Sequence, residues 1–197
     1  MQKTSPPKSR KLVLTGGPCG GKSTIAEVLG RSFNDKIVVV PESASALFRS
    51  GFPRFEEAEA THAFQTAVYQ VQIAVERAFE AHHGARFFVL DRGSIDGAAY
   101  WPDGPEKFFQ AQGTTVEAEL ARYDRVIYLE SAEEKDYEEH RAQNPVRSEG
   151  YMVARKLDAA TRALWTRHPN CTVVRSQASF SDKVQAVVKL LEKELSA

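Results

Sequence analysis

The stretch LVLTGGPCGGKST, residues 12–24, contains the Walker A pattern GxxxxGKS. An apolar run precedes this pattern and a helix-forming run follows it, so the stretch predicts a strand, a loop and a helix in succession. In such a loop the glycines allow backbone N–H groups to point at phosphate oxygens, and the helix N-terminus adds a partial positive charge. The stretch therefore predicts a loop that holds the phosphates of a nucleotide. A glycine-rich turn with a chance lysine is the alternative.

Individual roles follow for the residues of this loop. Lys22 is expected to reach the β- and γ-phosphates and to take part in catalysis, and the hydroxyl of Ser23 is expected to ligate Mg²⁺. The full set expected to contact the nucleotide is Gly17, Pro18, Cys19, Gly20, Gly21, Lys22, Ser23 and Thr24. Cys19 is interpreted as a small space-filling residue, with a redox switch as the alternative.

Apolar runs alternate with helical patterns along the rest of the chain. Strands are predicted over residues 11–15, 36–40, 86–90, 125–129 and 171–174, and helices over 23–33, 56–82 and 182–195, the last with Ser181 as its N-cap. Short helices broken by proline and glycine are expected over 94–121. Strands that are apolar throughout favour a parallel sheet with helices on both faces. We expect an α/β fold with five parallel strands in one domain over residues 11–197, preceded by a flexible tail over residues 1–10.

Composition narrows the classes of partner. The 26 basic residues balance the 26 acidic ones, so net charge gives no reason to expect a nucleic-acid partner. No apolar run is long enough to span a membrane, and the N-terminus does not read as a signal peptide. Two cysteines far apart in the sequence predict neither a disulfide framework nor a zinc site. We expect a cytoplasmic protein that acts on a small molecule, and the sequence leaves room for a homodimer.

Charged residues follow three of the predicted strands. The carboxyl ends of parallel strands meet at one edge of a sheet, so Glu42 and Asp91 are expected to lie near the phosphate loop. We assign Asp91 to Mg²⁺ and Glu42 to the acceptance of a hydroxyl proton, and Arg92 to the transferring phosphoryl group or the acceptor oxygen. The alternative for Glu42 is a charge that stabilises the N-terminus of a helix starting at Ser43. Glu130 is interpreted as an exposed cap.

Three further segments, VVVPESAS (38–45), AFQTAVYQVQ (63–72) and FFVLDRGSIDGAAY (87–100), resemble the motif order of deoxynucleoside kinases. The loop GGPCGGKST (16–24) and the segment NPVR (144–147) resemble the P-loop family that includes ribosylnicotinamide kinase domains and related AAA-type ATPases. Together the resemblance covers about residues 11–195. It implies a P-loop NTPase fold, with ATP as the phosphoryl donor and Mg²⁺ as the cofactor.

The resemblance also implies roles for particular side chains. Glu42 would be the base, Arg92 would lie near the acceptor hydroxyl, and Phe64 with Gln65 would bind the substrate. Helix packing is the alternative for Phe64 and Gln65. Deoxynucleoside kinases carry an arginine where this chain has Gln72, so the resemblance does not extend to recognition of a nucleobase by that residue.

The last candidates lie on the acceptor side. Arg141 and Arg147 are predicted to belong to a lid at about residues 141–150 and to neutralise charge in the transition state. Glu149 of that lid would hold a substrate hydroxyl, as lid glutamates do in the resembling kinases. A solvated helix end is the alternative for this charged segment. Trp101 is expected either to stack on a flat substrate or to belong to the core.

These residues together predict an ATP-dependent kinase. It would move the γ-phosphate to a hydroxyl of a small, nucleoside-like molecule. The alternative is a nucleotide-binding ATPase or GTPase-type regulator that acts on a protein or lipid partner. The sequence lacks the guanine-reading motif of translation-type GTPases and the DxxG motif of signalling GTPases, which weakens the GTPase alternative.

Overall fold

A computed structural model describes residues 9–53, 55–131, 150–176 and 179–196. Its centre is a sheet of five parallel strands in the order β2-β3-β1-β4-β5. The strands are β1 (Arg10–Gly16), β2 (Ile37–Val40), β3 (Phe87–Asp91), β4 (Arg125–Leu129) and β5 (Cys171–Val174). The predicted α/β fold with a five-stranded parallel sheet is confirmed. The central strand β1 leads directly into the phosphate loop. The loop therefore lies at the carboxyl ends of the strands, in the middle of the sheet.

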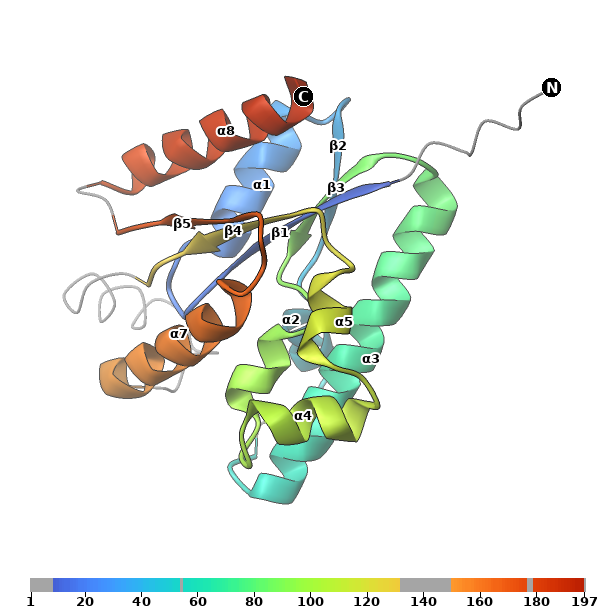
Figure 1. The fold of residues 1–197 in the computed structure, drawn as a ribbon, viewed down its shortest axis with the longest axis vertical. Coiled ribbons are helices and arrows are strands. Elements are labelled where there is room, and N and C mark those ends of the chain that lie inside the picture. The colour runs from blue at the N-terminus through green and yellow to red at the C-terminus, as the bar shows by residue number, and fades with distance from the viewer. Residues whose placement is uncertain (1–8, 54, 132–149, 177–178, 197) are drawn as a thin grey trace.

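Helices cover both faces of the sheet (Figure 1). The helices are α1 (Lys22–Ser32), α2 (Ser43–Arg49), α3 (Ala58–His83), the 3₁₀ helix η1 (Asp96–Tyr100), α4 (Pro105–Gln112), α5 (Val116–Leu120), α7 (Tyr151–Trp165) and α8 (Phe180–Ser196). On one face α1 and α8 pack on alternate residues of β1 such as Leu12 and Leu14, while Val13 faces the cluster that α3, α4, α5 and α7 form on the other. All three of these strand residues are fully buried, which explains why β1 is apolar throughout.

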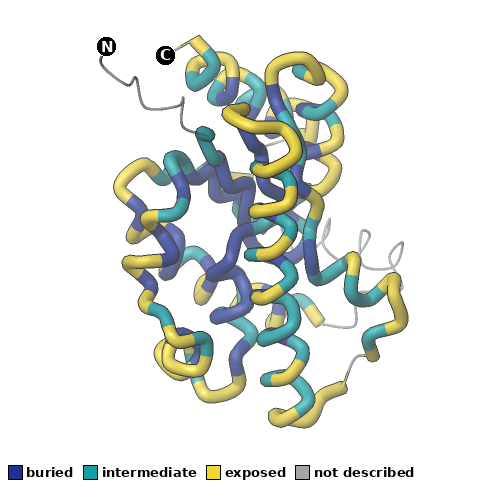
Figure 2. Tube along the Cα trace, turned by 90° about the vertical axis from the view of Figure 1, so that its right-hand side faces the viewer, coloured by how far each residue is buried: buried dark blue, intermediate teal, exposed yellow. Residues whose placement is uncertain are grey.

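The register aligns the carboxyl ends of the strands. Leu14 of β1 pairs with Asp91 of β3, and Gly16 pairs with Leu129 of β4. Residues that follow β1, β2, β3 and β4 therefore emerge at one edge. Figure 2 shows the buried strands in the interior and exposed residues on the outer sides of the helices. Within the described ranges, no helix is both long and apolar enough to cross a membrane.

Most elements begin or end one or two residues away from the predicted positions, and two of these differences have an identifiable cause. β1 begins at Arg10, a residue expected in the tail, because its guanidinium pairs with Glu194 of α8 at 2.9 Å and its backbone N–H bonds to Arg86. Helix α8 begins at Phe180 and its cap is Ser179 rather than Ser181. The Ser179 hydroxyl accepts the backbone N–H of Asp182 and donates to the carboxylate of Asp182, a reciprocal cap that Ser181 does not form.

Candidate active site

The phosphate loop has the backbone that its glycines predict. Gly16 and Gly21 have positive φ angles of 145° and 84°. A Cβ on Gly16 would lie 2.0 Å from the carbonyl oxygen of Leu129, and one on Gly21 would lie 2.4 Å from the ring of Phe180. Both positions therefore require glycine. Cys19, between them, adopts φ 57°, a left-handed conformation that helps to turn the loop.

Lys22 lies in the interior of the loop. Its ammonium group donates to the carbonyl oxygens of Gly16 at 2.9 Å and Gly17 at 2.7 Å. Burial lowers the pKa of Lys22 to about 7, and the positive charge of Arg92 acts in the same direction. The charges of Glu42 and Asp91 oppose this shift. Lys22 thus lies close enough to Glu42, after β2, and Asp91, at the end of β3, for their charges to affect its pKa.

Glu42 and Arg92 form an ion pair across the strand ends. Arg92 Nε lies 2.5 Å from Glu42 Oε1, and Ser45 donates its hydroxyl to the other carboxylate oxygen. Burial by itself would raise the pKa of Glu42, but the charge of Arg92 and the Ser45 hydrogen bond hold it below the usual value. Glu42 is therefore ionised at neutral pH. It also precedes the first residue of α2, as the helix-terminus alternative requires.

Asp91 is the last residue of β3 and is only 5% exposed. Burial raises its pKa and the nearby charge of Glu42 raises it further, while a hydrogen bond from Ser23 acts in the opposite direction. Its Oδ1 atom is buried without a hydrogen-bond partner. An unsatisfied carboxylate oxygen beside the Ser23 hydroxyl fits the oxygen ligands of Mg²⁺. The described ranges contain no group of three His, Cys, Asp or Glu side chains that could hold a metal ion.

Asp96 is a central residue of the site that the sequence analysis did not single out. Its Oδ1 accepts hydrogen bonds from Thr15 at 2.7 Å and from Arg92 Nη1 at 2.9 Å. Its Oδ2 accepts from the backbone N–H of Gly93 and from the indole N–H of Trp165. Asp96 thereby joins β1, the turn after β3 and α7. A carboxylate four residues after an arginine in the turn DRGSID was the available signal.

Gln72 of α3 connects the segments that follow β2 and β3. Its Oε1 accepts the Ser43 hydroxyl at 2.7 Å, and its Nε2 donates to Glu76 at 3.1 Å and to the carbonyl oxygen of Arg92 at 3.4 Å. The side chain is 3% exposed. The residue that stands where deoxynucleoside kinases carry an arginine is therefore committed to bonds inside the protein. It holds the segments after β2 and β3 together.

Comparison with known proteins gives the family. Residues 11–183 match a family model described as an AAA domain. The chain belongs to this family. The match covers the phosphate loop, Glu42, Asp91, Arg92 and Asp96, so this AAA-domain protein is a P-loop NTPase. No curated protein matches the sequence significantly.

A solved structure gives the fold of this AAA-domain protein independently. Deoxyadenosine kinase from M. mycoides with bound dATP matches with a TM-score of 0.64. The match covers 93% of this chain and 99% of the kinase, at 14% sequence identity. At this level of identity the match shows a shared fold. The P-loop kinase-like fold expected from the motif order is thus confirmed.

Two of the predicted substrate-binding residues of the AAA-domain protein, Phe64 and Gln65, lie on α3 where it packs against α2 and η1. Phe64 stacks on Phe48 with ring centroids 4.5 Å apart and an angle of 25°, and Phe52 packs on the same ring at 5.1 Å. Gln65 is 8% exposed, and its Oε1 lies 2.9 Å from the place that a Cβ on Gly97 would take. A glycine at 97 therefore makes room for this glutamine.

Trp101 belongs to the core, in agreement with the second of its two interpretations. It packs against Phe108 at 5.4 Å and His62 at 4.3 Å between ring centroids. His62 in turn lies 2.9 Å from Asp103. Contact of Trp101 with a substrate stays a prediction. Arg141, Arg147 and Glu149 lie outside the described residues.

Glu130 is not the exposed cap that the sequence suggested. Its carboxylate lies 2.6 Å from Arg162 of α7 and accepts the backbone N–H of Ser176 after β5 at 3.3 Å. Its backbone oxygen accepts the ammonium group of Lys183 at 2.6 Å. Glu130 is half-buried because three segments converge on it, all distant in sequence. It links β4, α7 and the start of α8 beside the phosphate loop.

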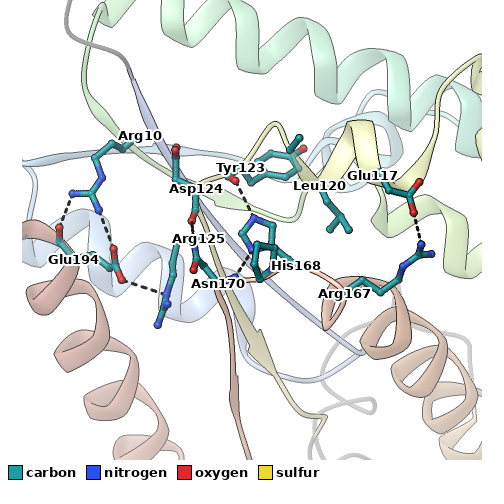
Figure 3. Close-up of a pocket in the computed structure, with 12 residues that line it drawn as sticks. Arg10, Glu117, Leu120, Tyr123, Asp124, Arg125, Arg167, His168, Asn170 and Glu194 are labelled. Atoms are coloured by element: carbon teal, nitrogen blue, oxygen red, sulfur yellow. Dashed lines mark hydrogen bonds and ion pairs between the residues drawn. The ribbon is translucent and has the colours of Figure 1, made fainter.

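A separate pocket of about 720 Å³ lies at the opposite end of the sheet (Figure 3). Arg10 and Arg125, the first residues of β1 and β4, line it, and both pair with Glu194. Arg167 at its rim pairs with Glu117. Because Arg10 and Arg125 are paired with Glu194 and lie at the amino ends of their strands, this pocket is not part of the phosphate site.

Proposed function

We propose that this protein is an ATP- and Mg²⁺-dependent phosphotransferase that moves the γ-phosphate to a hydroxyl of a small, nucleoside-like molecule. The observation that carries the proposal is the Glu42–Arg92 ion pair beside Lys22. A phosphate loop by itself holds a nucleotide. A carboxylate and a guanidinium at the adjacent strand ends supply groups for a second, hydroxyl-bearing substrate.

On the donor side, Lys22 exchanges the carbonyl oxygens of Gly16 and Gly17 for phosphate oxygens when the nucleotide enters. This exchange costs little free energy, because the ammonium group has oxygen partners both before and after the nucleotide binds. Backbone N–H groups of the loop and the N-terminus of α1 hold the remaining phosphate charge. Ser23 and Asp91 would hold Mg²⁺, which neutralises charge on the β- and γ-phosphates.

On the acceptor side, Glu42 holds the attacking hydroxyl. The carboxylate oxygen that Ser45 contacts in this structure is the one available to a substrate hydroxyl, since Arg92 occupies the other. A lowered pKa suits this role, because phosphoryl transfer through a loose transition state needs positioning of the nucleophile more than early removal of its proton. Arg92 stabilises the charge that spreads over the transferring group.

The acceptor is proposed to carry a flat ring. Phe48, Phe52 and Phe64 form a cluster of aromatic rings between α2 and α3, next to the helix that Glu42 precedes. Aromatic faces favour stacking with planar groups. The arginine that would help to read a nucleobase is replaced by Gln72, which is tied to Ser43, Glu76 and the Arg92 carbonyl. The predicted lid residues Arg141, Arg147 and Glu149 would complete this side.

A transfer assay tests the proposal. The protein is incubated with Mg²⁺, ATP labelled at the γ-phosphate, and a panel of nucleosides and small alcohols. We expect label to move to at least one compound with a ring and a primary hydroxyl. Slow release of inorganic phosphate alone, unchanged across a broad panel, would favour the regulator that acts on a protein or lipid partner. Lys22→Ala serves as the control for contaminating kinases.

A further inference from the structure

Asp158 of α7 touches the phosphate loop although no Walker A role calls for it. Its Oδ1 accepts the backbone N–H of Gly17 at 3.1 Å and the phenolic hydroxyl of Tyr128 at 2.7 Å. The Tyr128 hydroxyl also lies 2.7 Å from the Asp158 carbonyl oxygen. Asp158 is 5% exposed. Burial of a carboxylate oxygen is costly unless donors compensate it, and the Gly17 N–H and the Tyr128 hydroxyl do so for Oδ1.

The contact with Gly17 is tight on two sides. A Cβ at Gly17 would lie 2.3 Å from Asp158 Oδ1 and 2.3 Å from the hydroxyl oxygen of Ser131, just after β4. The Ser131 hydroxyl is buried without a hydrogen-bond partner. It therefore limits the space at Gly17 but forms no hydrogen bond with the loop. Asp158 is therefore the group that holds the Gly17 N–H, while Lys22 contacts the Gly17 carbonyl oxygen from the other side.

The charge of Asp158 is balanced nearby. Lys183 of α8 is buried, and its pKa is lowered by burial while the negative charges of Asp158 and Glu130 act in the opposite direction. A cation that Asp158 helps to keep charged reduces the net negative field that the carboxylate imposes on the loop. A carboxylate can thus remain next to a site for phosphates without strong repulsion.

We propose that Asp158 is a positioning residue for the nucleotide: through Gly17 it keeps the first turn of the phosphate loop in the conformation that receives phosphates. It does so without contact to the nucleotide. The proposal rests on the nucleotide-binding half of the proposed function and is independent of the acceptor. Its test is therefore a binding measurement, which keeps its meaning even if no transfer activity is found.

The binding test compares three variants with the wild type, using Mg²⁺–ADP and isothermal titration calorimetry. Asp158→Ala leaves the Gly17 N–H buried without a partner, and we expect about 10-fold weaker binding. Asp158→Asn keeps an oxygen that accepts both hydrogen bonds, and we expect binding within about 3-fold of the wild type. Tyr128→Phe is the matched control, because it removes the other donor to Asp158 and leaves Gly17 in contact.

Two results would overturn the proposal. Unchanged or tighter binding by Asp158→Ala would mean that the carboxylate does not organise the loop, or that phosphates displace it. An equal loss in Tyr128→Phe and Asp158→Ala would mean that the effect comes from the packing of α7 on β4. Thermal unfolding of each variant shows that the compared proteins are folded.

A measurement on the unmodified protein covers the case in which Asp158→Ala does not fold. Hydrogen exchange of the Gly17 amide is followed by nuclear magnetic resonance with and without Mg²⁺–ADP. The proposal requires that this amide be protected in both states, since Asp158 holds it throughout. Protection that is absent in the free protein, or lost when the nucleotide binds, would contradict it.

Discussion

Arg92 Nε lies 2.5 Å from Glu42 Oε1, so the first residue after β3 forms an ion pair with the second residue after β2. Arg92 adopts this position with φ 74°, a left-handed backbone conformation that is uncommon outside glycine. The conformation persists because Leu14 accepts the Arg92 N–H and Gln72 donates to the Arg92 carbonyl oxygen. Strained residues of this kind concentrate at functional sites. The predictions below follow from this pair and its neighbours.

Glu42→Gln is expected to lose transfer and keep nucleotide binding. The amide cannot accept the hydroxyl proton, and it weakens the bond to Arg92, so we expect kcat to fall about 10²- to 10⁴-fold. Affinity for Mg²⁺–ATP should stay within about 3-fold. The measurement is steady-state transfer to the best acceptor, with binding followed separately. Ser45→Ala is the control, since it removes a partner of Glu42 and leaves the carboxylate; wild-type kcat in Glu42→Gln would remove Glu42 from the mechanism.

Asp96→Asn is expected to destabilise the fold and to disturb Arg92. Asparagine keeps one oxygen as an acceptor, but its NH₂ group takes the place of the other. In the place of Oδ2, this NH₂ group would face two donors, the Gly93 N–H and the Trp165 N–H. Buried donors that face one another cost about 2–4 kcal/mol of unfolding free energy. Urea denaturation measures this cost. Thr15→Val removes a single donor to Asp96 with little change in side-chain size and should cost less; a loss in Thr15→Val as large as that in Asp96→Asn would show that the facing donors add nothing.

Nucleotide affinity is expected to fall as the pH rises above 7. Burial lowers the pKa of Lys22 in the free protein to about 7, so below that pH the group already carries its proton. Bound phosphates favour the charged form, and above pH 7 binding must bring a proton with it. The dissociation constant for Mg²⁺–ADP should then rise by up to about tenfold per pH unit.

Calorimetry in two buffers of different ionisation enthalpy measures this proton uptake between pH 7.5 and 9. Lys22→Arg is the control, because arginine stays charged throughout this range. A pH dependence that is the same in Lys22→Arg and in the wild type would show that Lys22 is not its source.

Asp91→Asn is expected to raise the Mg²⁺ requirement. The substitution removes the charge of the unsatisfied buried oxygen beside Ser23, which is the group suited to a cation. Half-maximal activity should then need at least about 10-fold more Mg²⁺, while binding of ADP in the presence of EDTA changes little or improves. Equal Mg²⁺ dependence of the two proteins would assign Asp91 a structural role.

Much of the candidate site could be predicted, because its residues either belong to one short motif or come directly after strands of a parallel sheet. The Walker A loop lies within a single stretch of chain, and its geometry depends on glycines at defined positions. Glu42, Asp91 and Arg92 converge because parallel strands end at the same edge, whatever their order in the sheet. Short-range errors, such as the cap of α8, came from two serines that are close in sequence and differ only in the reciprocal bonds that one of them forms.

The five strands, the phosphate loop and the charged residues beside it could be predicted from the amino-acid sequence, because each depends on periodicity or on spacing within a short segment. The strand order, the hydrogen-bond network around Asp96, the burial of Glu130 and the contact of Asp158 with Gly17 became visible in the folded protein alone. These features join residues that are far apart along the chain; Gly17 and Asp158 are separated by 141 positions. A carboxylate has the same local pattern in an exposed turn and in a buried contact, and only the packing of α7 against β1 and β4 distinguishes the two.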